Sequence, residues 1–223
     1  MCGRFSQAYS WADIVAFSRP LTVPEAPPNL RARYNIAPTT DIDILVRNTD
    51  GSRELKKARW GLVPAWWRKP LKELPATINA RAESVDEKAM FRKAFFSRRC
   101  IIPATGFFEW TGKPGEKVPH FISASDGGLL GFAGLWEKWR NDEGEEILTA
   151  TIIVREANQF MKRIHDRMPC MLHPRDFESW LDGSGGKDLL DVPPPELREW
   201  IVSQRVNKSG VGDDDPATIA PVT

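Results

Sequence analysis

Residues 100–154 contain four segments of one character, CIIPATGFFEW (100–110), PHFISA (119–124), GLLGFAGLWEKW (128–139) and ILTATIIV (147–154). Apolar, β-branched and aromatic residues fill these segments, and Gly, Pro and charged residues separate them. This pattern is typical of β-strands joined by short connections. IDILV (42–46) and ARWGLV (58–63) predict two more strands. Short strands with few helices between them predict an α+β domain around a curved, mostly antiparallel sheet.

Helices are predicted at four places. Ser10 and Asp13 form a capping-box pattern at the start of SWADIVAF. Ser84 and Glu87 form a second one, and the helix it predicts over residues 84–99 has one apolar face made of Val85, Ala89, Phe91, Ala94 and Phe95. Two shorter helices are predicted over 155–164 and over 174–181, the latter with Pro174 in its first turn.

The composition is that of an ordinary globular protein. The chain has 223 residues, 41% of them hydrophobic, and a formal net charge of +1, which fits one large domain. It shows neither a signal-peptide pattern nor an apolar run of transmembrane length, so we expect a cytoplasmic protein with no membrane partner. The three cysteines are odd in number and lack CxxC spacing, which excludes a disulfide framework and a zinc knuckle.

Several residues receive structural interpretations. Cys100 and Cys170 lie in apolar runs and are expected in the core. His120 and His173 are expected in a loop or at a helix start. The acidic run at 213–215 is expected to be solvated. Because the cysteines and histidines show no ligand-pair spacing, we expect no metal and no cofactor.

Basic residues gather between Arg47 and Lys72. Eight basic residues stand there against two acidic ones, together with Trp60, Trp66 and Trp67. A solvated face is one explanation. The other is an anionic partner, because basic residues interleaved with aromatic rings bind single-stranded nucleic acid through phosphate contacts and base stacking.

Cys2 follows the initiator methionine directly. Removal of Met1 would leave Cys2 with a free α-amine beside its thiol. The amine forms a Schiff base with an aldehyde, and the thiol then closes a five-membered thiazolidine ring. An α-amine has a pKa of roughly 7.7–8.0, so part of it is unprotonated near neutral pH. Position 2 is therefore suited to covalent chemistry on a carbonyl substrate, provided that other groups assist it.

Three stretches supply such groups. ATINARAES places Asn79, Arg81 and Glu83 at alternating positions, GFFEW places Glu109 between aromatic residues, and RIHDRMP places His165 after a short predicted helix. Desolvation raises the pKa of a carboxylate among aromatic rings, and histidine titrates near neutrality. Taken singly, each is more often a buried polar residue with a structural hydrogen bond.

Together, these motifs resemble those of the SRAP family, abasic-site sensors of single-stranded DNA. The resemblance extends over residues 2–207 and leaves 208–223 as an irregular tail. The motifs that carry it, in order, are MCGRF, RYNIAPT, RWGLVPAW, INARAES, FRKAF, RRCIIPATGFFEW, GLWEKW, IHDRMP and VSQRVN.

The resemblance implies a single α+β domain around a barrel-like sheet and a monomer that binds single-stranded DNA containing abasic sites. Cys2 would form the crosslink, Asn79 would position the sugar, Glu109 would deprotonate the α-amine, and His165 would assist ring opening and Schiff-base formation. The residues that would contact DNA are Arg4, Pro38, Trp66, Trp67 and Arg81. A lyase side activity is also implied, because an amine nucleophile at this lesion can promote elimination.

Two positions depart from the family pattern. Phe108 stands where the family often has Tyr, and Val154 stands where it usually has a phosphate-contacting Thr. Two other functions remain open from the residues. One is an N-terminal-nucleophile peptidase with Glu109 and His165 as acid–base partners, and the other is a single-strand DNA-binding module in which Cys2 has no role.

Overall fold

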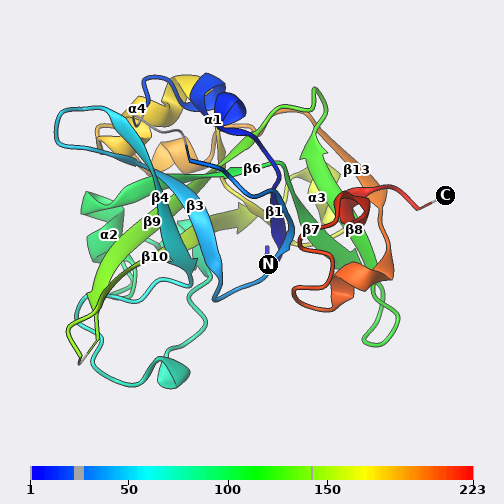
Figure 1. The fold of residues 1–223 in the computed structure, drawn as a ribbon, viewed down its shortest axis with the longest axis horizontal. Helices are drawn as coiled ribbons and strands as arrows, with labels where there is room; N and C mark the ends of the chain where they lie inside the picture. The colour runs from blue at the N-terminus through cyan, green and yellow to red at the C-terminus, as the bar shows by residue number, and fades with distance from the viewer. Residues whose placement is uncertain (1, 23–27, 142, 223) are drawn as a thin grey trace.

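The computed structural model describes residues 2–22, 28–141 and 143–222. It is the predicted α+β fold, in which two β-sheets carry most of the chain and a few short helices lie around them (Figure 1). The expected removal of Met1 concerns a residue outside the described ranges.

Five strands close into a barrel. Around it, β10 pairs with β4, β4 with β3, β3 with β6, β6 with β9, and β9 again with β10. All pairings are antiparallel except that of β10 with β4. The closed ring confirms the predicted barrel-like sheet. The strands are β3 (Asp41–Arg47), β4 (Arg53–Trp60), β6 (Arg99–Ala104), β9 (Leu130–Arg140) and β10 (Glu146–Glu156).

Three short strands extend the barrel. Strand β5 (Asn79–Arg81) runs parallel to β10, β11 (Arg167–Pro169) pairs antiparallel with β10, and β12 (Met171–Leu172) pairs antiparallel with β9. They bring the ATINARAES and RIHDRMP motifs to the same strand, β10.

The second sheet has the order β13-β8-β7-β1-β2 and is antiparallel throughout. In Figure 1, β1 and the start of the chain lie between the barrel and strands β7 and β8. One apolar core joins the barrel interior to this sheet, and Cys2 is part of it. The strands are β1 (Phe5–Gln7), β2 (Arg33–Ile36), β7 (Gly106–Thr111), β8 (Val118–Ala124) and β13 (Leu197–Ile201).

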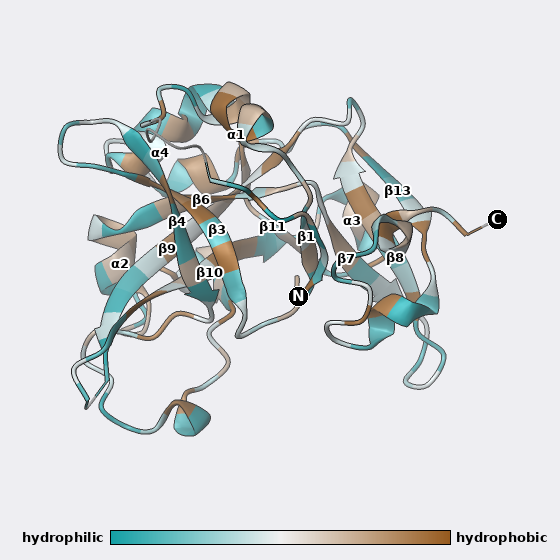
Figure 2. Cartoon of the chain, in the orientation of Figure 1, coloured by the Kyte–Doolittle hydropathy of each residue, from teal (hydrophilic) through white to brown (hydrophobic). Residues whose placement is uncertain are grey.

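The α-helices lie mainly against the outside of the barrel, and Figure 2 shows the hydrophobic residues along them and along the strands. The capping box of Ser10 and Asp13 starts α1 (Trp11–Ser18), as predicted. The others are α2 (Arg92–Ser97), α3 (Gln159–Lys162) and α4 (Phe177–Leu181). The 3-10 helices are Leu71–Glu73, Ala82–Ser84, Pro174–Asp176, Lys187–Leu190, Gln204–Asn207 and Pro216–Ile219.

The predicted helix over 84–99 is mostly wrong. Only Arg92–Ser97 is α-helical, residues 85–91 form turns, and Ala89 of the proposed apolar face is exposed. Contacts from distant segments explain the difference, because Lys187 Nζ donates to the Asp86 carboxylate at 2.6 Å and Arg167 pairs with Glu83. These ion pairs fix the segment against other elements, and tertiary contacts override local propensity.

Smaller expectations also change. β4 starts at Arg53 and ends at Trp60, so the strand predicted over 58–63 began and ended too late. Residues 155 and 156 belong to β10 rather than to the following helix. His120 lies buried within β8 and not in a loop, whereas His173 does stand at the start of a 3-10 helix. Cys100 and Cys170 are fully buried, as predicted.

The acidic run at 213–215 is not merely solvated. Asp213 bonds to Arg33 at 2.8 Å, Asp214 approaches Arg31 at 3.7 Å, and Asp215 bonds to Arg205 at 2.6 Å. The expected separation of a domain at 2–207 from a tail at 208–223 stays a prediction. Within the described ranges, no helix has both the length and the apolar character needed to cross a membrane.

Candidate active site

The start of the chain is held inside the molecule. The Arg4 carbonyl accepts a hydrogen bond from the Phe108 amide at 2.9 Å, and the Asn79 side-chain amide donates to the Cys2 carbonyl at 2.9 Å. Cys2 is fully buried. Chain ends fray unless contacts hold them. These hydrogen bonds therefore fix residue 2 in a defined position inside the molecule.

Glu109 lies on β7, the neighbour of β1, which places it beside the first residues of the chain. It is 2% exposed. Desolvation raises the pKa of this carboxyl to about 7. A carboxylate with such a pKa exchanges protons near neutral pH, as a general base must.

His165 follows α3 and faces Glu109, with 3.9 Å between its Nε2 and Oε2 of Glu109. Its Nδ1 accepts the Arg167 amide hydrogen at 3.0 Å, and the exposed Asp166 carboxylate also lies 2.9 Å from this nitrogen. The amide hydrogen cannot leave, whereas Asp166 can turn into water. We therefore assign the proton of the neutral ring to Nε2, on the side of Glu109. Burial lowers the pKa of His165, which favours this neutral form.

Asn79 is positioned by β5, in register with Ile152 of β10. Its Nδ2 is used by the Cys2 carbonyl, whereas its Oδ1 is buried and has no hydrogen-bond partner within the described residues. A buried acceptor left open costs stability, and at this place it offers a hydrogen bond to a bound substrate.

The Cys2 thiol lies 3.9 Å from the Arg4 carbonyl oxygen, to which it donates. Burial, followed by the negative charge of Glu109, raises the pKa of this thiol far above its usual range. The thiol is therefore protonated at neutral pH and is not a ready thiolate nucleophile.

A pocket of about 500 Å³ opens onto Glu109 and His165. The sequence did not single out the other residues that line this pocket, because only the fold brings the connection over residues 115–117 and Asn207 next to Glu109 and His165. The one available signal was that Trp110 and Asn207 belong to the GFFEW and VSQRVN motifs. The remaining lining residues are Trp110, Gly115, Lys117 and Asn207. Within the described ranges, no cluster of His, Cys, Asp and Glu is arranged to hold a metal ion.

The residues predicted to contact DNA differ in accessibility. Arg81 is exposed, and Trp66 is 52% exposed. Trp67 is buried against Val63 and Trp139. Pro38 is half-buried in the turn between β2 and β3, and Arg4 is buried. Their contacts with DNA stay predictions.

Both departures from the family pattern are core positions. Phe108 packs against Phe121, and Val154 lies in the core of the barrel; both are fully buried. At position 154 the valine therefore offers neither a hydroxyl group nor an exposed surface to a phosphate.

The fold and the site define a class of protein: a barrel-containing α+β chain whose second residue, a cysteine, is buried beside a glutamate and a histidine. A family model described as SOS response associated peptidase (SRAP) matches residues 1–209, and this chain belongs to that family.

Similar sequences and solved structures support this family membership. The chain is 41% identical over 184 residues to "Abasic site processing protein YoqW" of Bacillus subtilis, with 82% of this chain and 80% of that protein covered. It is 41% identical over 215 residues to "Abasic site processing protein YoaM" of the same organism, with 93% of each covered. A crystal structure of a protein from Bacteroides thetaiotaomicron superposes with a TM-score of 0.84 at 27% identity and covers 100% of both chains.

Proposed function

We propose that this protein captures abasic sites in single-stranded DNA through a thiazolidine crosslink between Cys2, freed of Met1, and the aldehyde form of the abasic deoxyribose. The observation that carries the proposal is that buried Cys2 and Glu109 lie close together, with Asn79 bonded to the Cys2 carbonyl, half-buried His165 facing Glu109, and the Glu109 pKa at about 7. The names of the relatives, abasic site processing proteins, support abasic sites as the substrate.

The amine reacts first in this mechanism. Glu109 accepts a proton from the α-ammonium group, and the freed amine nitrogen attacks the C1′ aldehyde carbon. The resulting carbinolamine loses water: protonated Glu109 returns its proton to the departing oxygen, the Nε2–H of neutral His165 donates a hydrogen bond to that oxygen, and a C=N bond forms. The Cys2 sulfur then adds to the imine carbon while its proton moves to the nitrogen. One water molecule leaves for each thiazolidine formed.

The high pKa of the thiol supports this order of events. A protonated, buried thiol is a poor nucleophile toward the aldehyde, but it becomes intramolecular once the imine has formed. Proximity of that kind replaces the need for a thiolate. The open Oδ1 of Asn79 is suited to accept a hydrogen bond from a hydroxyl group of the opened sugar.

DNA binding would come from the basic stretch and its exposed aromatic residue. Trp66 offers a stacking surface and Arg81 a phosphate contact, and neither contact depends on base sequence. The reactive aldehyde, which intact nucleotides lack, would then distinguish the lesion from the rest of the strand.

The test uses one oligonucleotide in two states. Purified protein is incubated with single-stranded DNA containing uracil, before and after uracil excision, and analysed for a heat-resistant shifted band. We expect the band only after excision. It should be lost in Cys2→Ala and kept in Cys170→Ala, the matched control at another buried cysteine. Protein that retains Met1 should form no thiazolidine, because its Cys2 nitrogen remains an amide.

Other outcomes would support the alternatives. Peptide cleavage without a DNA adduct would indicate a peptidase. A heat-labile shift of equal strength with and without the lesion would indicate a non-covalent binding module.

A further inference from the structure

Arg4 is held by the C-terminal part of the chain. Its Nη1 donates to Asn35 Oδ1 at 2.6 Å and to the Val206 carbonyl at 2.9 Å, and its Nη2 donates to Ser209 Oγ at 3.0 Å. The side chain is 8% exposed. The contacts with Val206 and Ser209 join residue 4 to residues 202 and 205 positions later, and neither belongs to a strand pairing.

Asn35 is in turn held by the same C-terminal residues. Its Nδ2 donates to the carbonyls of Lys208 at 3.2 Å and Val211 at 2.7 Å. Its backbone amide donates to Asp213 Oδ1 at 3.0 Å. Asn35 is fully buried, so its orientation toward Arg4 is fixed from three sides.

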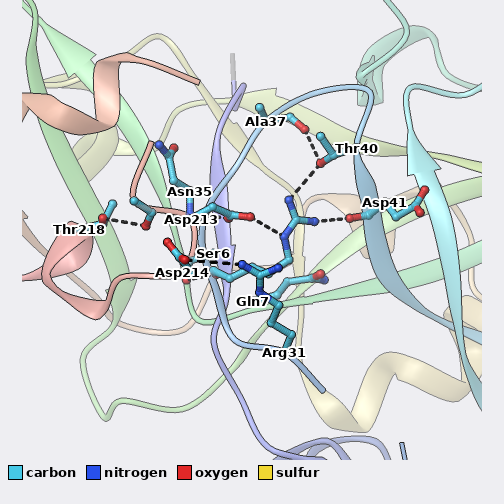
Figure 3. A network of polar contacts seen from close by, with 12 residues as sticks. Ser6, Gln7, Arg31, Asn35, Ala37, Thr40, Asp41, Asp213, Asp214 and Thr218 are labelled. Carbon is cyan, nitrogen blue, oxygen red and sulfur yellow. Dashed lines mark hydrogen bonds and ion pairs between the residues drawn. The ribbon is translucent and has the colours of Figure 1, made fainter. Parts of the chain in front are cut away.

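Asp213 fastens this arrangement. Its carboxylate accepts from Arg33 Nε at 2.8 Å as well as from the Asn35 amide, and its carbonyl accepts from the Tyr34 amide at 2.8 Å. The Asp213 and Arg33 side chains are 19% and 21% exposed. Figure 3 shows Asp213 pointing toward β2, beside Asn35.

Asp214 provides a natural contrast. It lies 3.7 Å from Arg31, and these two side chains are 73% and 72% exposed. In Figure 3 they meet beside the Asp213 contacts. An exposed pair of this kind contributes little to stability, whereas removing one partner of a largely buried, multiply bonded pair leaves the other unsatisfied.

The other end of Arg4 belongs to the active site. Its carbonyl oxygen accepts from the Phe108 amide and from the Cys2 thiol. The strand that follows, β1, has only three residues. Only Gly3 separates Arg4 from Cys2, so a shift of the Arg4 backbone also alters the position of the Cys2 thiol that donates to it.

We infer that residues 206–213, the C-terminal strap, position Cys2 for its reaction by holding Arg4 through Asn35, and that Asp213 is the positioning residue that fastens the strap. The inference rests on the proposed function. It gives Arg4 the task of holding the nucleophile in place; the competing possibility is that DNA phosphate displaces the strap from Arg4.

The experiment compares Asp213→Ala, Asp213→Asn and the matched control Asp214→Ala. The first measurement is the single-turnover rate of adduct formation at saturating abasic single-stranded DNA. A displaced nucleophile should lower this rate by about 10- to 100-fold in Asp213→Ala. The rate should fall less in Asp213→Asn, because the amide oxygen of the asparagine still accepts from the Asn35 amide. The rate of Asp214→Ala should match that of the wild type. Should Asp213→Ala not fold, Arg33→Gln removes the same ion pair from the other side.

The second measurement is affinity for the same oligonucleotide without the lesion, which should stay within about twofold of wild type because positioning acts on the chemical step. Equal adduct rates in Asp213→Ala and Asp214→Ala would overturn the inference. So would parallel losses of rate and lesion-free affinity. Tighter lesion-free binding in Asp213→Ala would also overturn it and would indicate that the strap competes with phosphate.

A third measurement needs no DNA. The rate at which iodoacetamide alkylates Cys2, measured by mass spectrometry of the Cys2 peptide, should be at least about fivefold higher in Asp213→Ala. A loosened chain start unfolds locally more often and exposes the thiol. If wild-type protein forms no adduct, the proposed function fails, while the alkylation rates still decide on the strap. Unchanged alkylation in Asp213→Ala relative to Asp214→Ala would overturn it.

Discussion

Two glutamate–histidine pairs lie at the second sheet and differ in their hydrogen-bond partners. Three of the four residues stand on its strands, whereas His165 follows α3. Glu109 and His165 form one pair, and Glu199 and His120 form the other. They are close neighbours, because Glu109 stands directly opposite His120 in the ladder of β7 and β8. Residues directly opposite one another in such a ladder point to the same face of the sheet.

The His120 pair is closed, in the sense that both ring nitrogens of His120 have protein partners. Nδ1 of His120 lies 3.0 Å from Glu199 and Nε2 lies 2.9 Å from Thr111 Oγ1, so both ring nitrogens are used. Arg163 approaches the second oxygen of Glu199 at 3.6 Å. In the Glu109 pair, Nε2 and Oε2 are 3.9 Å apart, beyond hydrogen-bond distance, and a pocket of about 500 Å³ reaches both residues.

The two rings also carry their protons on opposite nitrogens. Because Glu199 accepts at Nδ1, neutral His120 has its hydrogen there, whereas in His165 Nδ1 accepts from a backbone amide and the hydrogen is on Nε2. A histidine whose partners are all protein groups holds strands together. Nε2 of His165 instead faces Glu109, beside the pocket that opens onto both residues.

The largest contrast is expected between Glu109→Gln and Glu199→Gln in adduct formation. Removing the base should lower the single-turnover rate by a factor of about 100 or more, whereas Glu199→Gln should stay within about threefold. In the wild type the rate should rise with pH to a plateau above about 7, because Glu109 acts in its ionised form. That step should vanish in Glu109→Gln, and a step that persists would belong to another group.

The next contrast is between the two histidines. His165→Ala should slow adduct formation by about 10- to 100-fold with unchanged affinity for lesion-free single-stranded DNA. His120→Asn should leave the rate nearly unchanged at temperatures well below its unfolding midpoint. Because the pocket opens onto His165, added imidazole should restore part of the lost rate. Equal loss of binding and rate in His165→Ala would mean that His165 is structural.

Replacing the glutamate by glutamine should change the free energy of unfolding in opposite directions in the two pairs. The pKa of Glu109 rises from 4.5 to about 7 in the folded state, so between these values the folded protein holds a proton that the unfolded chain has released. Its free energy of unfolding therefore falls as pH rises through this window. At pH 8, Glu109→Gln should be more stable than wild type by up to about 3 kcal/mol, whereas Glu199→Gln should be less stable by about 1 kcal/mol.

Urea denaturation at pH 5 and pH 8 measures this difference. Near pH 5 the gain from Glu109→Gln should shrink toward zero, because wild-type Glu109 is then largely protonated when folded. A gain that is independent of pH would contradict the role of desolvation.

The sequence predicted the candidate site residues better than it predicted the contacts between distant segments that support them. Cys2, Asn79, Glu109 and His165 were selected from their chemistry and motif context. In the fold, Glu109 lies near Cys2 and faces His165, and Asn79 bonds to the Cys2 carbonyl. Strand pattern likewise predicted the barrel-like sheet, and Ser10 with Asp13 predicted the start of α1. Each of these signals is carried by residues that are close in sequence.

The errors concern residues whose partners are distant in sequence. The helix predicted over 84–99 gives way to turns held by Arg167 and Lys187. Asp213 was expected in solvent but is bonded to β2. His120 was expected in a loop or at a helix start, although the predicted strand 119–124 contained it; it lies in β8 and pairs with Glu199, seventy-nine positions away. Local propensity carries no information about such contacts.

The smallest effect is expected from Thr111→Val, which removes only the hydroxyl group that His120 Nε2 uses. Losing this partly buried bond should lower the free energy of unfolding by about 1 kcal/mol. The adduct rate should remain within about twofold of wild type, because Thr111 touches the closed pair and not the pocket. Thr22→Val, at an exposed threonine bonded to Ser52, is the matched control and should cost less. A large change in the adduct rate of Thr111→Val, with little change in stability, would mean that both pairs act in the reaction.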